Sequence, residues 1–258
     1  MLLTVTRMRR ISCLLAMMSS VGCAAGVGGE IEAYVGGDKA DGSSERLKTV
    51  DRYRLDINEP SDLTLVDGEL YVISDVHSRI YRISPRGRIK STTDIEGSDM
   101  EALSFDNKHD TFIVGDESSG TIWRIDDDGS RGHPIELDDA EDGNSGIEGL
   151  AFDDDGHLFV AKEKNPARIY ELDDKGQILH DTKIDFADDL SALAWNPEDG
   201  HLYALSDEEH SLYKLDRDLE IDTAWRLPIE HPEGLAFDGD RIFVVSDSEE
   251  RLYELERD

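Results

Sequence analysis

Residues 147–172 read IEGLAFDDDGHLFVAKEKNPARIYEL, and residues 231–256 read HPEGLAFDGDRIFVVSDSEERLYELE. Both stretches contain Glu-Gly-Leu-Ala-Phe, then a turn rich in Asp and Gly, then an apolar run followed by a carboxylate, and finally Tyr-Glu-Leu. The apolar residues recur with a spacing near two, which indicates β-strands rather than helices. The two stretches are therefore copies of one β-rich unit.

The unit occurs five times between residue 47 and the end of the chain. The other three copies contain SDLTL…LYVISD…IYRI, EALSF…TFIVGD…IWRI and SALAW…LYALSD…LYKL. A period of about 43 residues, built from short alternating segments, is typical of a β-propeller blade. One leucine marks each copy, at intervals of 40, 47, 43 and 42 residues: Leu63, Leu103, Leu150, Leu193 and Leu235.

The third copy shows how one unit divides into four strands. Its predicted strands cover residues 148–152, 158–161, 169–172 and 177–186. Asp and Gly between them favour tight turns, because Gly adopts positive φ without a steric penalty. These segments lack the spacing and terminal Glu of an EF-hand loop, so we interpret them as hairpin turns. Each copy is predicted to be a four-stranded blade.

The two ends of the repeat predict how the ring closes. The last copy stops after its third strand, at Leu255, and a strand-like piece at 47–57 precedes the first copy. If this piece forms the outer strand of the last blade, the ring closes and open sheet edges are removed. We therefore predict an all-β fold, a five-bladed β-propeller over residues 47–258.

The composition is strongly acidic, with 59 Asp and Glu against 27 Lys and Arg. We therefore do not expect the protein to bind nucleic acid, because such binding requires clustered Lys and Arg. The few lysines and many carboxylates suit a protein that works in high salt, where self-repulsion is screened. Both cysteines lie in the first 23 residues, so the repeat region offers neither a disulfide nor a cysteine-ligated metal site.

The N-terminus has the layout of an export signal. Three arginines within residues 7–10 precede a short apolar run at 11–18 and small residues at 19–22, and the run is too short to span a bilayer. The segment ending at Cys23 resembles a lipobox, which predicts a lipoprotein signal at 1–23. Ordinary cleavage near Ala25 is the alternative. Residues 24–46 are predicted to be a flexible tether, and a lipid on Cys23 is the only membrane attachment expected for an exported, monomeric domain.

Two positions in each copy bring carboxylates together. The first opens the inner strand and the second follows the second strand, so the antiparallel pairing of these strands places both at one edge of the sheet. The inner strand of a propeller lines the central channel, and up to eight carboxylates are therefore expected at one mouth. The first position holds Ser61, Glu101, Glu148, Ser191 and Glu233, and the second holds Asp75, Asp116, Glu163, Asp207 and Asp247.

Carboxylates that cluster raise one another's pKa unless a cation neutralises them. Calcium, which takes about six to eight oxygen ligands, suits such a ring. Zinc suits it less, because no Cys or paired His lies in register. A Glu that opens an inner strand is badly placed for core packing, which favours a metal or ligand role, whereas hairpin capping explains the second position equally well. The predicted metal ligands are Glu101, Glu148, Glu233, Asp116, Glu163 and Asp247.

The units at 147–172 and 231–256, together with the export signal before them, resemble the SdiA-regulated domain family of bacterial envelope proteins. The resemblance covers residues 47–258. NHL-repeat and gluconolactonase-like propellers share the Glu-Gly-Leu-Ala-Phe-Asp motif. The resemblance implies a five-bladed propeller with a bound calcium ion and no established activity. It also implies Glu101, Glu148 and Glu233 as calcium ligands, while Ser61 and Ser191 depart from the pattern and make the expected site lopsided.

Two classes of function follow. The preferred one is a calcium-stabilised envelope module that binds an unknown small ligand or envelope protein. The alternative is a calcium-dependent hydrolase similar to lactonases or propeller phytases, in which a metal-bound water attacks the substrate. Few Lys and Arg are expected at the mouth, which disfavours a polyphosphate substrate. The chain has no nucleophile elbow, HExxH or phosphate loop, and no catalytic residue is assigned, although His77, His210 and His231 lie in loops expected at the mouth.

Overall fold

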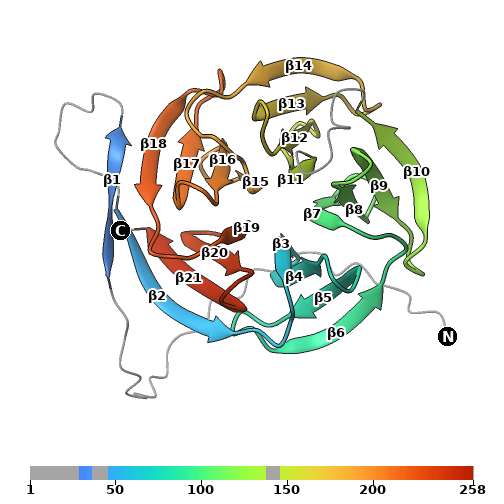
Figure 1. Ribbon diagram of the computed structural model, residues 1–258, viewed down its shortest axis with the longest axis horizontal. Coiled ribbons are helices and arrows are strands. Elements are labelled where there is room, and N and C mark those ends of the chain that lie inside the picture. The colour runs from blue at the N-terminus through green and yellow to red at the C-terminus, as the bar shows by residue number, and fades with distance from the viewer. Residues whose placement is uncertain (1–28, 37–45, 138–145, 258) are drawn as a thin grey trace, which may run out of the picture.

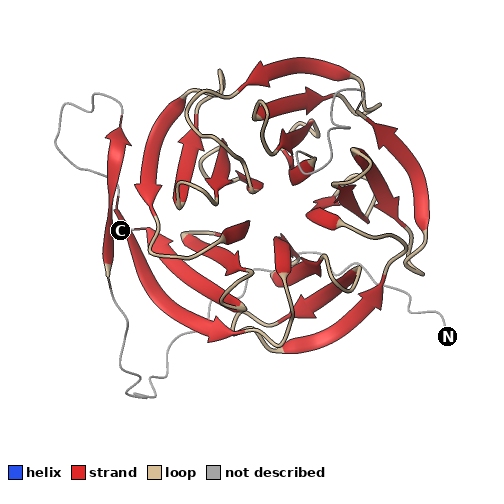
Figure 2. Ribbon diagram, viewed as in Figure 1, coloured by secondary structure: helices blue, strands red, loops and turns tan. Residues whose placement is uncertain are grey.

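The computed structural model describes residues 29–36, 46–137 and 146–257, and every regular element in these ranges is a β-strand. Five blades surround a central channel (Figure 1), and the strands are shown in red in Figure 2. No helix within the described ranges is long and apolar enough to cross a membrane. The predicted all-β, five-bladed propeller is confirmed. The predicted signal and Cys23 lie outside the described residues.

Blades 1 to 4 are each built from four consecutive antiparallel strands. Blade 1 contains β3 (Pro60–Val66), β4 (Glu69–Ser74), β5 (Arg79–Ile83) and β6 (Ile89–Asp94). Blade 2 contains β7 (Met100–Asp106), β8 (Thr111–Asp116), β9 (Thr121–Ile125) and β10 (Arg131–Glu136). Blade 3 contains β11 (Ile147–Phe152), β12 (Leu158–Lys162), β13 (Arg168–Leu172) and β14 (Ile178–Lys183). Blade 4 contains β15 (Ala192–Asn196), β16 (His201–Ser206), β17 (Ser211–Leu215) and β18 (Ile221–Arg226).

Blade 5 joins the two ends of the chain. It contains β19 (Pro232–Asp238), β20 (Arg241–Ser246), β21 (Arg251–Arg257) and, as its outer strand, β2 (Arg46–Arg54). Leu47 to Arg54 pair antiparallel with Arg257 to Arg251, with one bulge at Val50. The predicted closure by the N-terminal piece is therefore confirmed. The piece continues past the strand as far as Ile57, which is buried between blades 1 and 5.

A strand in the predicted tether is the main difference from expectation. β1 (Glu30–Gly36) pairs with β2 on one side and with β18 on the other, so blades 4 and 5 form one nine-stranded sheet. Ile31 is 7% exposed and packs in the core shared by these blades. The segment has the period-two alternation of a strand, with Ile31, Ala33 and Val35 apolar, but the glycines on both sides favoured a linker interpretation.

The hydrophobic core lies between neighbouring blades. All five leucines that mark the repeat are at most 2% exposed. Aromatic rings fill the wider spaces further out, as where Tyr203 of blade 4 lies 4.6 Å from Phe237 of blade 5. Each fully buried large apolar side chain contributes about 1.5–3 kcal/mol to folding. The fold is thus stabilised by contacts that every blade repeats.

The inner strands approach one another closely at the position before each leucine. A Cβ at Gly149 would lie 2.6 Å from the backbone nitrogen of Leu193, and one at Gly234 would lie 2.7 Å from the Cα of Asp62. Contacts this short with backbone atoms force a shift, so small residues are required there. The register places Ala or Gly at this position in four blades and Asp62 in blade 1.

Asp62 uses its carboxylate to connect three blades. It is fully buried and accepts hydrogen bonds from the backbone N–H groups of Leu63 and Leu103, both at 2.7 Å. The N–H of Leu235 in blade 5 is a third donor to the same carboxylate. Inner strands have no sheet partner on the channel side, so their N–H groups need such an acceptor. Asp62 therefore acts as a clamp between blades 5, 1 and 2.

Candidate functional site

A β-bulge opens the inner strand in four blades. In blade 2, Met100 pairs with Asp116 and Ala102 with Gly115, which leaves Glu101 as the extra residue. Glu148 and Glu233 are the extra residues of blades 3 and 5. A bulge redirects the side chain of its extra residue away from the regular alternation. The three glutamates are thereby turned out of the interblade core and into the mouth of the channel.

Serines occupy the same place in the other two blades. Ser61 is the extra residue of the bulge in β3. In blade 4 the N–H of Ser191 donates to the carbonyl of Leu205, which also faces Ala192. The hydroxyl of Ser191 donates to the carbonyl of Pro232 at 2.7 Å. The expected lopsidedness toward blades 2, 3 and 5 is thus present in the geometry.

The register corrects one predicted residue. The residue that pairs with the start of the inner strand is Ser74 in blade 1, Asp116 in blade 2 and Ser246 in blade 5. The acids that follow this pair are therefore Asp75, Glu117 and Asp247. Asp116 instead bonds the hydroxyl of Ser118 at 2.9 Å and lies 3.5 Å from Arg131. The acidic position was therefore assigned one residue too early in blade 2: Glu117, and not Asp116, follows the paired residue, and it lies beside Glu148 and Glu163 without lining the cavity itself.

Left-handed backbone at three non-glycine residues leads into these bulges. Glu59, Asp99 and His231 have φ values of 44°, 64° and 44°, and each directly precedes the first residue of an inner strand. Such conformations cost about 1–3 kcal/mol each and persist where the surroundings enforce them. They add two more carboxylates and the imidazole of His231 to the mouth region; His231 was expected in a loop there, whereas the sequence pattern gave no signal of Glu59 and Asp99.

The mouth is a cavity of about 200 Å³ that is lined almost entirely by carboxylates. Five of the six predicted ligands line it; Asp116 does not. Asp189, which was not predicted, is buried at its wall and accepts hydrogen bonds from the Ser206 hydroxyl at 2.5 Å and the Asp207 N–H at 3.0 Å. The lining residues are Glu59, Ser61, Asp75, Glu101, Glu148, Glu163, Asp189, Ser191, Asp207, Glu233 and Asp247.

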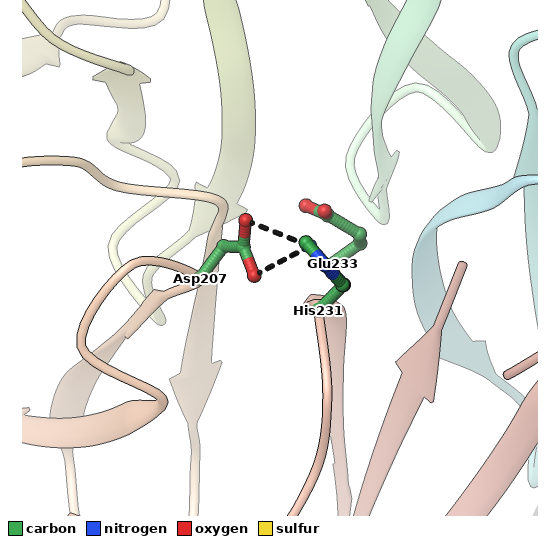
Figure 3. A group of neighbouring side chains, drawn as sticks. All are labelled: Asp207, His231 and Glu233. Carbon is green, nitrogen blue, oxygen red and sulfur yellow. Dashed lines mark hydrogen bonds and ion pairs between the residues drawn. The ribbon is translucent and has the colours of Figure 1, made fainter. Parts of the chain in front are cut away.

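Three groups within the mouth bring possible ligand atoms within 4.8 Å of one another. Each group combines a bulge glutamate with the acid that follows the second strand of the preceding blade. Figure 3 shows the group at blades 4 and 5, where His231 and Glu233 lie beside the carboxylate of Asp207. The groups are Asp75, Asp99 and Glu101; Glu117, Glu148 and Glu163; and Asp207, His231 and Glu233.

Burial and mutual repulsion raise the pKa values of the bulge glutamates. Burial, with the nearby charge of Asp75, raises the pKa of Glu101 to about 8. Burial, with Asp207 and Asp247, raises the pKa of Glu233 to about 9. Burial and the surrounding glutamates, Glu101 first, raise the pKa of Glu148 well above its ordinary value. The mouth therefore holds protons near neutral pH unless a cation replaces them.

Few basic groups compensate this charge. Lys164 forms an ion pair with Glu163, and His231 Nδ1 lies 3.2 Å from Asp207, which raises the pKa of the imidazole. Of the other groups expected nearby, Arg79 pairs with Asp94, and His210 Nδ1 lies 2.8 Å from the carbonyl oxygen of Ile229. A phosphate-binding arrangement is therefore not formed at this mouth by the described residues.

The donor set fits a hard divalent cation. Ligands on opposite sides of a calcium ion lie about 4.8 Å apart, because each calcium–oxygen distance is about 2.4 Å. The mutual separations within the three groups fall within that limit. All but one of the donors are carboxylates, which match calcium and magnesium better than zinc or copper. Each of Glu101, Glu148 and Glu233 would supply a ligand to such an ion within its own group, together with the acid of the preceding blade.

The fold and this cavity define the class: a five-bladed β-propeller with a carboxylate-lined mouth. Residues 55–256 match the sequence profile of the SdiA-regulated family, and the chain belongs to that family. None of the curated proteins compared with the chain matches it. Family membership confirms the resemblance that the repeated motif indicated.

Several solved structures share the architecture. Glutaminyl cyclase from Myxococcus xanthus has a TM-score of 0.67 and 12% identity, over 82% of this chain and 96% of that chain. PQQ-bound aldose sugar dehydrogenase from Streptomyces coelicolor has a TM-score of 0.54 and 13% identity, over 83% of this chain and 98% of that chain. Virginiamycin B lyase from Staphylococcus aureus has a TM-score of 0.50 and 17% identity, over 87% of this chain and 79% of that chain. These three proteins are enzymes, but at such identities the likeness shows the fold alone.

Proposed function

We propose that this protein is an exported cell-envelope propeller that binds calcium at its acidic mouth and presents that face to a small ligand or an envelope protein. One observation carries the proposal: bulges in blades 2, 3 and 5 direct Glu101, Glu148 and Glu233 into one cavity, each beside an acid of the preceding blade. Buried carboxylates this close are unfavourable without a counter-charge. A bound cation would remove that cost and stabilise the ring.

Calcium is preferred to magnesium because of how the ligands are held. Their backbones belong to inner strands that pack against one another, so the ligand positions are set by the ring. Calcium accepts about six to eight oxygens in irregular geometry, whereas magnesium demands a near-ideal octahedron and retains its waters. Ser61 of blade 1 and Ser191 of blade 4 lie on either side of blade 5, and a ligand would approach the ion at these two positions, where the inner strand carries no carboxylate.

The location is part of the same proposal. The basic and apolar layout of residues 7–22 supports export, and the lipobox-like segment supports a lipid on Cys23. Release as a soluble exported protein by cleavage near Ala25 is the other outcome, and mass spectrometry of the mature N-terminus separates the two.

Calcium is expected to raise the melting temperature of the protein. At about 100 times its dissociation constant, a ligand of the native state adds roughly 2.7 kcal/mol, which corresponds to about 5–10 °C for a domain of this size. Melts in constant high salt with chelator, calcium and magnesium measure this. Glu148→Gln is expected to lose the calcium shift, because it removes the ligand at the centre of the middle group.

Glu96→Gln is the matched control for that variant. Glu96 is exposed in the segment before β7 and lies outside the cavity, and the variant makes the same chemical substitution, a glutamate to a glutamine. The control is expected to keep the full calcium shift. Equal melting of the unmodified protein in chelator, magnesium and calcium would contradict the proposal and would leave the carboxylates as solvated charge or hairpin caps.

A calcium-dependent hydrolase is the second candidate, and His231 is the observation that favours it. Asp207 fixes the Nδ1 side of His231, which leaves Nε2 to accept a proton, and Glu233 lies beside it (Figure 3). A bound ion would supply a polarised water. Lactone hydrolysis that requires calcium and falls about 100-fold or more in His231→Gln would support this candidate. Unchanged hydrolysis in that variant, or none in the unmodified protein, counts against it.

A further inference from the structure

The outer rim at the junction of blades 5 and 1 is basic, in contrast to the acidic chain as a whole. Arg52 and Arg54 are exposed on β2, and Arg86 and Arg88 are exposed in the turn between β5 and β6. These four residues are called the rim patch. In a chain with 59 acidic and 27 basic residues, four neighbouring exposed arginines are a local reversal of charge.

The fold places the two pairs of arginines around one strand edge. A Cβ at Gly87, between Arg86 and Arg88, would lie 3.1 Å from the carbonyl oxygen of Arg54 and 3.3 Å from the Cβ of Tyr53. Arg52 and Arg54 are two residues apart, so their side chains share one face of β2. The turn packs beside Tyr53, whose ring belongs to the core on the other face. The rim patch therefore straddles β2 beyond residue 48, where its pairing with β1 ends.

Local acids offset only part of this charge. Glu250 lies 4.0 Å from Arg54, and the Asp51 carboxylate accepts the N–H of Arg52 at 2.8 Å. Among the described residues, Arg52, Arg86 and Arg88 form no ion pair, and such exposed guanidinium groups are available to an anionic partner. The four arginines are spread over two neighbouring elements, β2 and the turn between β5 and β6, so the patch fits a broad anionic surface better than a single small anion.

The path of the chain indicates which surface this is. The carbonyl of Gly29 accepts the N–H of Thr49, and Glu30 pairs antiparallel with Lys48. The chain therefore comes to β1 from the end of β2 that carries Arg52 and Arg54. Cys23 lies six residues before Gly29, a reach of at most about 20 Å. A lipid on Cys23 would bring the rim patch to the bilayer surface.

We propose that the rim patch binds anionic phospholipid headgroups and holds the propeller edge-on to the membrane. A lipid on Cys23 only tethers the chain near the bilayer, whereas a basic cluster that binds anionic headgroups would fix which edge of the domain faces the bilayer. This inference rests on the export and lipidation included in the proposed function, but not on calcium. The channel axis then runs along the membrane, and the acidic mouth stays open to the side instead of facing anionic lipid.

Vesicle binding tests the proposal. The chain from residue 24 onward, which lacks both the basic, apolar signal segment and Cys23, is sedimented with neutral phosphatidylcholine vesicles and with vesicles that also contain phosphatidylglycerol, in chelator so that calcium cannot bridge acids. At low salt, the amount of protein bound to anionic vesicles is expected to be about tenfold or more the amount bound to neutral vesicles. This ratio is expected to fall in high salt. Arg52→Gln, Arg54→Gln, Arg86→Gln and Arg88→Gln together are expected to return the ratio to about one.

A charge-matched control separates the patch from net charge. Replacement by Gln of four exposed cations elsewhere, Lys108, Lys175, Lys183 and Arg217, is expected to keep the ratio of the unmodified protein. Equal ratios for the patch and control variants would overturn the proposal, as would no preference of the parent protein for anionic vesicles. The patch variant is expected to keep its calcium-induced melting shift, so loss of vesicle binding and failure of the calcium site are distinguishable.

Discussion

Asp62→Ala is expected to lower the melting temperature by about 10 °C. The change leaves the N–H groups of Leu63, Leu103 and Leu235 without their common acceptor in the channel. Each unsatisfied buried N–H costs about 1–3 kcal/mol, and 1 kcal/mol corresponds to about 2–4 °C for a domain of 150–250 residues. Water entering the channel recovers part of the loss, which sets the expectation at about 3–5 kcal/mol.

Asp56→Ala is the matched control for this effect. Asp56 is exposed, lies six residues before Asp62, and its loss relieves the same unit of negative charge. The control is expected to melt within about 1–2 °C of the parent, since exposed substitutions usually change stability by less than about 0.5 kcal/mol. If Asp62→Ala melts with the control, the three N–H groups are satisfied without the carboxylate and the clamp is not needed.

Calcium binding is expected to tighten by at least about 100-fold between pH 6 and pH 8, as protons leave the mouth. In the cation-free protein the pKa values of Glu101 and Glu233 are about 8 and about 9, because burial and neighbouring acids oppose ionisation. A cation must therefore displace these protons at every pH between 6 and 8, and each displaced proton changes the calcium affinity by up to about tenfold per pH unit. Calorimetry in buffers of different ionisation enthalpy counts the protons released.

The same groups predict the sign of the pH effect on stability. An unfolded glutamate ionises near pH 4.3, whereas Glu101 and Glu233 stay protonated in the folded state until about pH 8 and 9. Between these limits the folded state holds more protons, so cation-free stability falls as the pH rises. Calcium is expected to reverse this trend. Glu233→Gln is expected to release about one proton fewer; affinity that is flat from pH 6 to 9 would rule the exchange out.

The repeat made the architecture predictable because each blade buries the same apolar positions. Leu63 and its four counterparts identified the five copies, and the unpaired piece at 47–57 indicated how the ring closes. The acidic mouth was predictable for the bulge glutamates, since a Glu that opens an inner strand has no place in the core. Which acid follows the second strand in blade 2 was not, because Asp116 follows a short apolar run in the sequence as Asp75 does, whereas its pairing with Met100 places it level with Ser74 and Ser246.

Other parts of the site depend on contacts between blades that one copy cannot indicate. The clamp at Asp62 replaces an Ala or Gly, and its three donors come from three blades. The left-handed backbone of Asp99 and His231 follows from how the loops enter the inner strands, and neither residue type demands it. β1 did carry an alternating pattern, but its pairing with β18 depends on a blade that lies nearly two hundred residues later.

Because one residue at the start of each inner strand lines the mouth, from a bulge in blades 1, 2, 3 and 5 and without one in blade 4, the five blades offer five comparable places around one cavity. A change at any of them alters the charge, the number of oxygens and the opening on that side, and leaves the core residues of the blade in register. Ser61 and Ser191 are the two of these positions that carry a hydroxyl instead of a carboxylate. The order Ser-Glu-Glu-Ser-Glu around the ring therefore sets the charge and the oxygen ligands of the mouth, and a substitution in one blade at a time can change its binding preference.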